Sequence, residues 1–224
     1  MNAELIGAGE VEPAQLEHMA GIFNEILASE NISIETCTVA GCDPRKLRAA
    51  FQKASSRYDL VLAVGGLGLG PEGNAKETLA AFLGRRLVLH QETLKRIQTA
   101  YARAGRNMPQ AASRLAAMPE QSIVFPGQKG ITPGCGVSLG KKQIILLPDL
   151  EREAVPMVQA CVAPYLARLS GGGGVIRVVN IFGLSEEEVH EKIESKYGSL
   201  RNPTVSVRSK EGEVQAVIST QANS

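Results

Sequence analysis

The 224-residue sequence lacks a charge excess and a long apolar run. Its 24 Lys and Arg against 23 Asp and Glu leave a net charge of +1, too little to attract nucleic acid or an anionic membrane from a distance. No apolar stretch approaches the roughly 18 residues of a membrane span. The first residues, MNAELIGAGEV, show no basic leader before an apolar core. We therefore expect a cytoplasmic protein that binds neither nucleic acid nor membrane.

The four cysteines and three histidines form no metal-binding motif. Cys37, Cys42, Cys135 and Cys161 show no C-x-x-C spacing and have no histidine nearby, which argues against structural zinc. We expect reduced, buried or inert thiols. The histidines, including His90, lie beside charged or polar residues, and we expect them to be surface side chains.

The sequence as a whole contains 44% hydrophobic residues, as ordinary globular proteins do. Their periodicity is typical of an α/β domain. The pattern predicts strands over 3–8, 31–40, 60–64, 122–125, 137–139 and 143–147. It predicts helices over 13–29, 44–57, 74–83, 91–105, 110–118 and 151–169. Asp43 is expected to cap the second helix, ahead of Pro44. These elements predict a three-layer domain with a mostly parallel sheet over residues 1–169.

Residues 170–174, SGGGG, predict a flexible linker because consecutive glycines disfavour regular structure. Beyond it, a strand over 175–182, a helix over 185–197 capped by Ser185, and strands over 204–210 and 213–220 predict a small β-α-β-β domain. The second domain is therefore expected over 175–224.

The most informative segment is 60–78, LVLAVGGLGLGPEGNAKET, in which an apolar strand enters a loop of five glycines and then a helix. Glycines let the backbone approach an anion, and free NH groups at a helix start favour negative charge. Asn74 with Glu77 three residues later predicts a capping box for that helix. The loop is neither a Walker motif nor a G-x-G-x-x-G motif. The carboxyl ends of parallel strands are where open α/β sheets bind ligands, so we expect a phosphate here.

The chain resembles the CinA family of competence/damage-inducible proteins and their relatives, the molybdopterin-binding domains. The motifs that carry the resemblance are DLV at 59–61, GGLG at 65–68, KET at 76–78, FLGR at 82–85, YARAGRNMP at 101–109, GITPG at 130–134 and ILLP at 145–148. FGLSE at 182–186, NPTV at 202–205 and KEGEV at 210–214 extend it. It implies a molybdopterin-binding-like domain followed by a KH-like domain, without the family's C-terminal amidase domain, and a homo-oligomer, expected to be a dimer.

The resemblance also implies a small-molecule nucleotide or pterin phosphate as ligand, and metal-dependent cleavage of the pyrophosphate of ADP-ribose. In that activity water is the nucleophile, Glu72 and Asp149 are the catalytic carboxylates, and Glu72, helped by Asp149 or Glu10, holds Mg²⁺, Mn²⁺ or Co²⁺. The residues expected to bind the ligand are Gly9, Glu10, Gly65, Gly66, Leu67, Gly68, Leu69, Gly70, Asn74, Gly134, Pro148 and Glu153.

The chain departs from the family where those carboxylates should lie. Glu72-Gly73 replaces an acidic pair, the turn after the first strand is shorter, and Asp149 replaces a glycine. A hard cation commonly needs one or two carboxylates beside phosphate oxygens, and Glu72 still supplies one. The acidic residues could equally be solvated at helix starts, where negative charge is favourable.

Two functions therefore remain open, a phosphate-binding protein that has lost hydrolysis and an active ADP-ribose pyrophosphatase. A third, RNA binding by the KH-like domain, is disfavoured because 175–224 contains no G-x-x-G loop. A non-catalytic interaction or molybdopterin-binding role is the remaining alternative.

Overall fold

The computed structural model describes residues 1–169, 176–198, 204–210 and 213–219. Its contacts divide the chain into an N-terminal unit, Met1–Ala28 with Ile32–Pro164, and a C-terminal unit, Ser29–Asn31 with Tyr165–Ser224. The expected glycine linker at 170–174 lies outside the described residues, and the boundary at 169 stays a prediction. No helix in the described part of the chain is long and apolar enough to cross a membrane.

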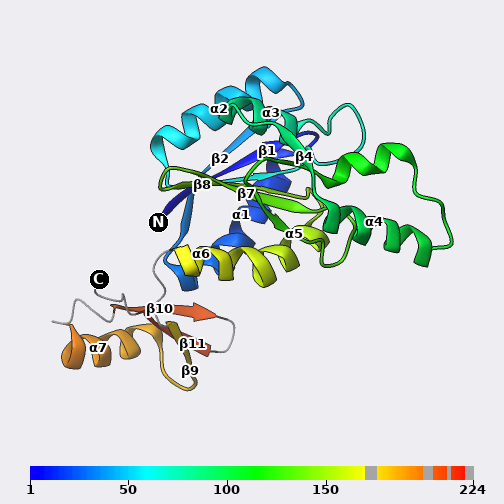
Figure 1. Ribbon diagram of the computed structural model, residues 1–224. Helices are drawn as coiled ribbons and strands as arrows, with labels where there is room; N and C mark the ends of the chain where they lie inside the picture. The colour runs from blue at the N-terminus through cyan, green and yellow to red at the C-terminus, as the bar shows by residue number, and fades with distance from the viewer. Residues whose placement is uncertain (170–175, 199–203, 211–212, 220–224) are drawn as a thin grey trace. The chain divides into compact units, whose positions relative to one another are not determined.

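The N-terminal unit is built on a six-stranded sheet with the order β2-β1-β3-β8-β7-β6 (Figure 1). The strands are β1 (Asn2–Ala8), β2 (Ser33–Gly41), β3 (Leu60–Val64), β6 (Ile123–Phe125), β7 (Gly134–Leu139) and β8 (Lys142–Leu147). β2, β1, β3 and β8 run parallel, while β7 and β6 are antiparallel to their neighbours. The predicted mostly parallel sheet is confirmed.

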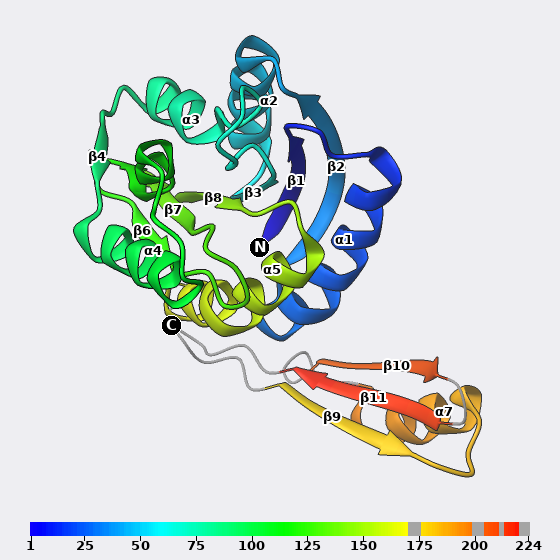
Figure 2. The ribbon, with the colours of Figure 1, turned by 90° about the vertical axis from the view of Figure 1, so that its right-hand side faces the viewer.

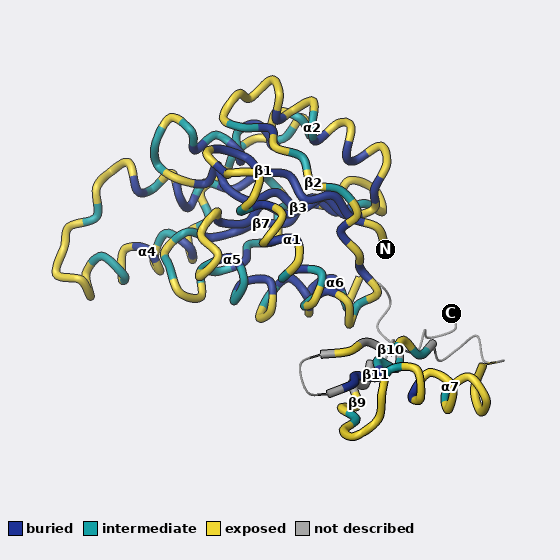
Figure 3. Tube along the Cα trace, turned by 180° about the vertical axis from the view of Figure 1, so that it is seen from behind, coloured by how far each residue is buried: buried dark blue, intermediate teal, exposed yellow. Residues whose placement is uncertain are grey.

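Helices cover both faces of this sheet (Figures 1 and 2). One face carries α2 (Pro44–Arg57) and α3 (Ala75–Leu83), and the other carries α1 (Pro13–Leu27) and α5 (Glu151–Met157). The boundary between the two units falls within α6 (Ala163–Leu169). Phe51 and Leu79 from the first pair pack with Val61, Ala63 and other strand residues in one buried cluster. The inner strands β1, β3 and β8 are buried along most of their length, whereas much of the edge strand β2 and the outer sides of the helices are exposed (Figure 3). The predicted three layers are confirmed.

Two predicted helices differ from the structure. Residues 110–118 form a 3₁₀ helix, η2 (Gln110–Ala116), followed by β5 (Ala117–Pro119), which pairs with β4 (Leu87–Leu89). The physical reason is Pro119, which disfavours a helical conformation for the residue before it. The helix over 151–169 is interrupted by a π-helical turn, η3 (Val158–Val162). Pro156 and Pro164 flank that turn and lack the NH that an α-helix needs.

The helix caps test the sequence predictions residue by residue. Asp43 accepts a hydrogen bond from the Arg45 amide at 2.8 Å and caps α2 as predicted. The predicted capping box of α3 is wrong, since the Asn74 side chain accepts no capping bond. His90 is half-buried, and its Nδ1 accepts from the Thr93 amide at 3.2 Å and caps α4 (Gln91–Arg103), a role that was not predicted from the sequence.

The C-terminal unit contains β9 (Ile176–Ile181), α7 (Glu186–Tyr197), β10 (Thr204–Lys210) and β11 (Glu213–Ser219). Its antiparallel sheet has the order β10-β11-β9. Ser185 and Glu188 form a reciprocal capping box at the start of α7. The predicted β-α-β-β module is confirmed, while its turn at 211–212 lies outside the described residues.

Candidate functional site

The carboxyl ends of the parallel strands meet at one edge of the six-stranded sheet. Val64 at the end of β3 lies beside Gly7 of β1 and Leu147 of β8. The antiparallel strands bring two more segments to this edge, because Gly134 begins β7 directly opposite Phe125, the last residue of β6. The loops that carry the sequence-predicted site residues therefore lie along one edge, as expected for a ligand site in an open α/β sheet.

The glycine loop, defined here as residues 65–74, is fixed to neighbouring strands through its backbone. The Gly65 amide donates to the Leu147 carbonyl at 2.9 Å, and the Ala75 amide donates to the Gly66 carbonyl at 3.0 Å. Gly65 has φ +92°, and a Cβ there would meet the Ala8 carbonyl oxygen. Only glycine fits this conformation and this close approach. The first turn after β3 is thus held against β1 and β8.

Five successive backbone NH groups of this loop have no internal partner. Within the described part of the chain, the amides from Gly66 to Gly70 donate to no acceptor. Leu67 is buried, whereas Gly68 is exposed and Leu69 and Gly70 are half-buried. Unpaired donors that border solvent are the groups that bind an anion at a strand-to-helix turn. The loop therefore has the chemistry of a phosphate cradle.

Arg114 joins this loop to η2. Its guanidinium donates to the Leu69 carbonyl at 3.3 Å and to the Gly73 carbonyl at 3.4 Å, and it forms an ion pair of 3.3 Å with Glu77. One oxygen of the Glu77 carboxylate, Oε2, is buried and has no hydrogen-bond partner among the described residues. Arg114 thereby contacts the middle and the far end of the loop and the helix that follows it.

Lys76 also links α3, the helix after the glycine loop, to η2. Its buried ammonium group donates to the Arg114 and Leu115 carbonyls at 2.9 and 3.0 Å. Burial lowers the pKa of Lys76, and the nearby Arg114 charge lowers it further, while Cys135 and Glu77 oppose the shift. Sequence reasoning missed both cations as support for the loop, because their partners lie far away in the chain.

Glu72 lies inside the glycine loop. Its carboxylate sits against Gly68 and Gly70, close enough that a Cβ at Gly70 would collide with it. Asn74 holds the far end of the loop, donating to the Cys42 carbonyl at 2.9 Å after β2. The structure therefore brings Glu72, the predicted metal and catalytic carboxylate, together with the predicted phosphate-binding glycines.

The other predicted carboxylates occupy separate loops of the same edge. Glu10 is exposed after β1, and Asp149 is exposed after β8, where its carbonyl accepts from Gln15 at 2.9 Å. The Glu153 carboxylate packs against Gly130 in the segment before β7. Burial raises the pKa of Glu153 and the Asp149 charge adds to the increase, while Arg152 opposes it. Glu153 is thus placed beside segment 126–133 by its contacts.

The remaining predicted residues, Gly9, Gly134 and Pro148, are buried at this edge of the sheet. Gly9 donates its amide to the Gly41 carbonyl at 3.0 Å. Nowhere in residues 1–169, 176–198, 204–210 and 213–219 do three or more His, Cys, Asp or Glu side chains gather in a way that could hold a metal ion. Glu72 could therefore hold a divalent cation only if phosphate oxygens and water supplied the other ligands.

Comparisons with known proteins agree with this architecture. Residues 9–168 match the family model described as "Probable molybdopterin binding domain". A CinA-like protein from Dictyoglomus turgidum is 37% identical over 88% of this chain and 48% of its own length. A CinA-like protein from Dictyoglomus thermophilum is 35% identical, again over 88% and 48%. The chain thus spans about half the length of these curated relatives.

A solved structure shows the same fold. The crystal structure of a CinA protein from Thermoplasma acidophilum superposes with a TM-score of 0.62 at 22% identity, covering 73% of this chain and 96% of that one. The resemblance predicted from the sequence motifs is confirmed by these matches. The chain belongs to the molybdopterin-binding domain family and is CinA-like.

Proposed function

We propose that the N-terminal unit binds a small molecule that carries a phosphate, either a nucleotide or a pterin phosphate, in the glycine loop. The observation that carries this proposal is the run of unpaired amides from Gly66 to Gly70 at the carboxyl edge of the sheet. Because the loop is already fixed by Arg114 and by strand contacts, ligand binding requires little ordering of the backbone. The family's molybdopterin-binding description supports a small-molecule ligand of this kind.

Calorimetric titration tests the proposal with ADP-ribose, AMP and molybdopterin in parallel. We expect one saturable event for at least one ligand and none for adenosine, which lacks phosphate. A tenfold or greater loss of affinity is expected when Gly68 is replaced by Asp, since a carboxylate there would repel the phosphate. The absence of saturable heat with all three ligands contradicts the proposal.

Glu72 makes the binding dependent on a cation. A carboxylate against Gly68 and Gly70 lies where phosphate would bind, so the two negative charges repel unless a divalent cation lies between them. Such a cation supplies neutralisation of the phosphate charge. We expect Glu72→Gln to raise affinity measured in EDTA by about tenfold and to abolish the gain on adding Mg²⁺. The matched control is Glu25→Gln on α1, an exposed carboxylate that should change neither value.

Hydrolysis of ADP-ribose is a second candidate function, favoured by the position of Glu72 within the loop. The exposed Asp149 carboxylate on the same edge is available to orient water. Release of AMP from ADP-ribose with Mg²⁺, Mn²⁺ or Co²⁺ would support hydrolysis, and its loss in Glu72→Gln would assign it to this loop. If no cation yields AMP while binding persists, the chain is a binding protein without this activity.

A further inference from the structure

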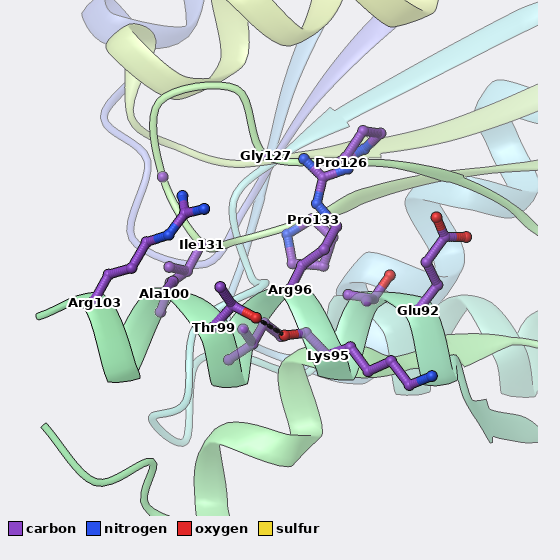
Figure 4. Close-up of a pocket in the computed structure, with 13 residues that line it drawn as sticks. Glu92, Lys95, Arg96, Thr99, Ala100, Arg103, Pro126, Gly127, Ile131 and Pro133 are labelled. Carbon is purple, nitrogen blue, oxygen red and sulfur yellow. Dashed lines mark hydrogen bonds between the residues drawn. The ribbon is translucent and has the colours of Figure 1, made fainter.

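A groove of about 480 Å³ lies in the N-terminal unit between α4 and segment 126–133 (Figure 4). We call it the α4 groove. None of the sequence-predicted site residues lines it. Ile97 and Ala100 of α4 and Ile131 and Pro133 of the facing segment supply apolar surface. Part of the groove's lining is therefore apolar.

Cations dominate its polar lining. Lys95, Arg96 and Arg103 line the groove together with a single carboxylate, Glu92. In the part of the chain that the structure describes, none of the three cations forms an ion pair, unlike Arg114 and Arg86 elsewhere in this unit. In Figure 4 the side chains of Arg96 and Arg103 rise toward segment 126–133, whereas Lys95 extends along the helix.

The opposite wall offers unpaired backbone donors. Among the described residues, the amides of Gly127, Gly130 and Ile131 donate to no acceptor. The wall is closely packed at its glycines, because a Cβ at Gly127 would meet the Gly130 carbonyl and one at Gly130 would meet the Glu153 carboxylate. Backbone amides facing unpaired guanidinium groups are complementary to an anion.

We propose that the α4 groove is a second anion-binding site, which takes the phosphate or pyrophosphate of a small organic molecule separately from the glycine loop. Guanidinium groups bind phosphate oxygens in a two-pronged manner. Arg96 and Arg103 are seven residues apart, so they lie about 10 Å apart along the helix axis and on the same side of it. That spacing suits a pyrophosphate or two separate anionic groups, while the apolar surface accepts the organic part.

Residue-resolved NMR tests this with inorganic pyrophosphate as the probe at low ionic strength. Titration should shift the amide resonances of Gly127 and Gly130 in a saturable way. The double variant Arg96→Gln/Arg103→Gln should weaken that response at least tenfold. Two controls at exposed positions of α2 outside the groove, Lys46→Gln and Arg48→Gln, should change it by less than about twofold. All of these side chains are exposed, so the variants are expected to fold.

The same spectra separate this site from the glycine loop, whose reporters are Gly66 and Gly68. Loss of the Gly127 and Gly130 shifts in the double variant, with the Gly66 and Gly68 shifts retained, establishes two sites. Shifts of Gly127 and Gly130 without any at Gly66 and Gly68 support the α4 groove and contradict phosphate binding by the glycine loop. The proposal is overturned if Gly127 and Gly130 do not shift, or if the double variant and both controls weaken the response equally.

Discussion

Two loops on one sheet edge are held in different ways. The glycine loop is connected to β8, to η2 and to the residue after β2 by backbone bonds and by the side chains of Arg114 and Asn74. In segment 126–133, the Gln128 side chain donates hydrogen bonds to the Pro126 carbonyl and to the Cys161 sulfur. The first loop is thus preorganised by hydrogen bonds, and the second is shaped by close glycine contacts opposite the cations of α4.

The two proposed sites would therefore recognise an anion in two different ways. The glycine loop relies on oriented backbone dipoles, whose effect is local, and its one nearby carboxylate is repulsive. The α4 groove relies on full charges at the surface, which added salt screens. We therefore expect phosphate affinity at the groove to fall more steeply with ionic strength than affinity at the glycine loop.

The largest effect is expected from breaking the close approach under the glycine loop. Gly65→Ala should lower the free energy of unfolding by at least about 3 kcal/mol, because the methyl group collides with the Ala8 carbonyl at a positive φ. Gly140→Ala is the matched control, with φ +62° but open space around the added atom, and should cost about 1 kcal/mol. Urea denaturation measures both. Equal losses would show that the close approach does not matter.

A smaller effect is expected from removing the buried ammonium group of Lys76, which bonds to η2. Lys76→Met should cost about 2 kcal/mol, since two backbone carbonyls lose their donor. Lys46→Met on α2, an exposed position, should stay within about 0.5 kcal/mol of the wild type. Thermal unfolding measured at the same pH compares them. If Lys76→Met is as stable as Lys46→Met, the support of the loop does not pass through Lys76.

The smallest effect concerns Glu153 beside the second loop. Its raised pKa means that the folded state favours the protonated form, so this stabilisation is present below the ordinary value of 4.5 and lost as pH rises through the folded pKa. Glu153→Gln should therefore raise Tm at pH 7 by about 1 °C, a small change because the group is partly exposed. The difference should vanish near pH 4. A lower Tm at pH 7 would contradict burial as the cause.

The sequence predicted the layers of the fold because its central strand β3 is a continuous apolar run and its helices carry clear signals, such as Asp43 and Ser185. It could not predict the β4–β5 pair, whose strands have three residues each and depend on each other across the chain. The Asn74 cap could not be predicted either. The Asn74 backbone has φ −117° and ψ 9° instead of the extended conformation of an N-cap, and its side-chain amide donates to a carbonyl after β2.

The candidate site was predictable only in part. The glycines and Glu72 are adjacent in sequence, so their proximity followed from one motif. Arg114 lies 37 residues from Glu77 in a polar stretch with no periodic signal, and only the folded chain brings it to the loop. The same holds for Arg96 and Arg103, which read as ordinary exposed helix residues until segment 126–133 packs opposite them.

A crystal structure with ADP-ribose and Mg²⁺ tests the central claim most directly. We expect phosphate oxygens within hydrogen-bond distance of the amides between Gly66 and Gly70, with Mg²⁺ between the phosphate and Glu72. A ligand bound elsewhere on the chain, with these amides facing only water, would contradict the assignment of the glycine loop as the phosphate site.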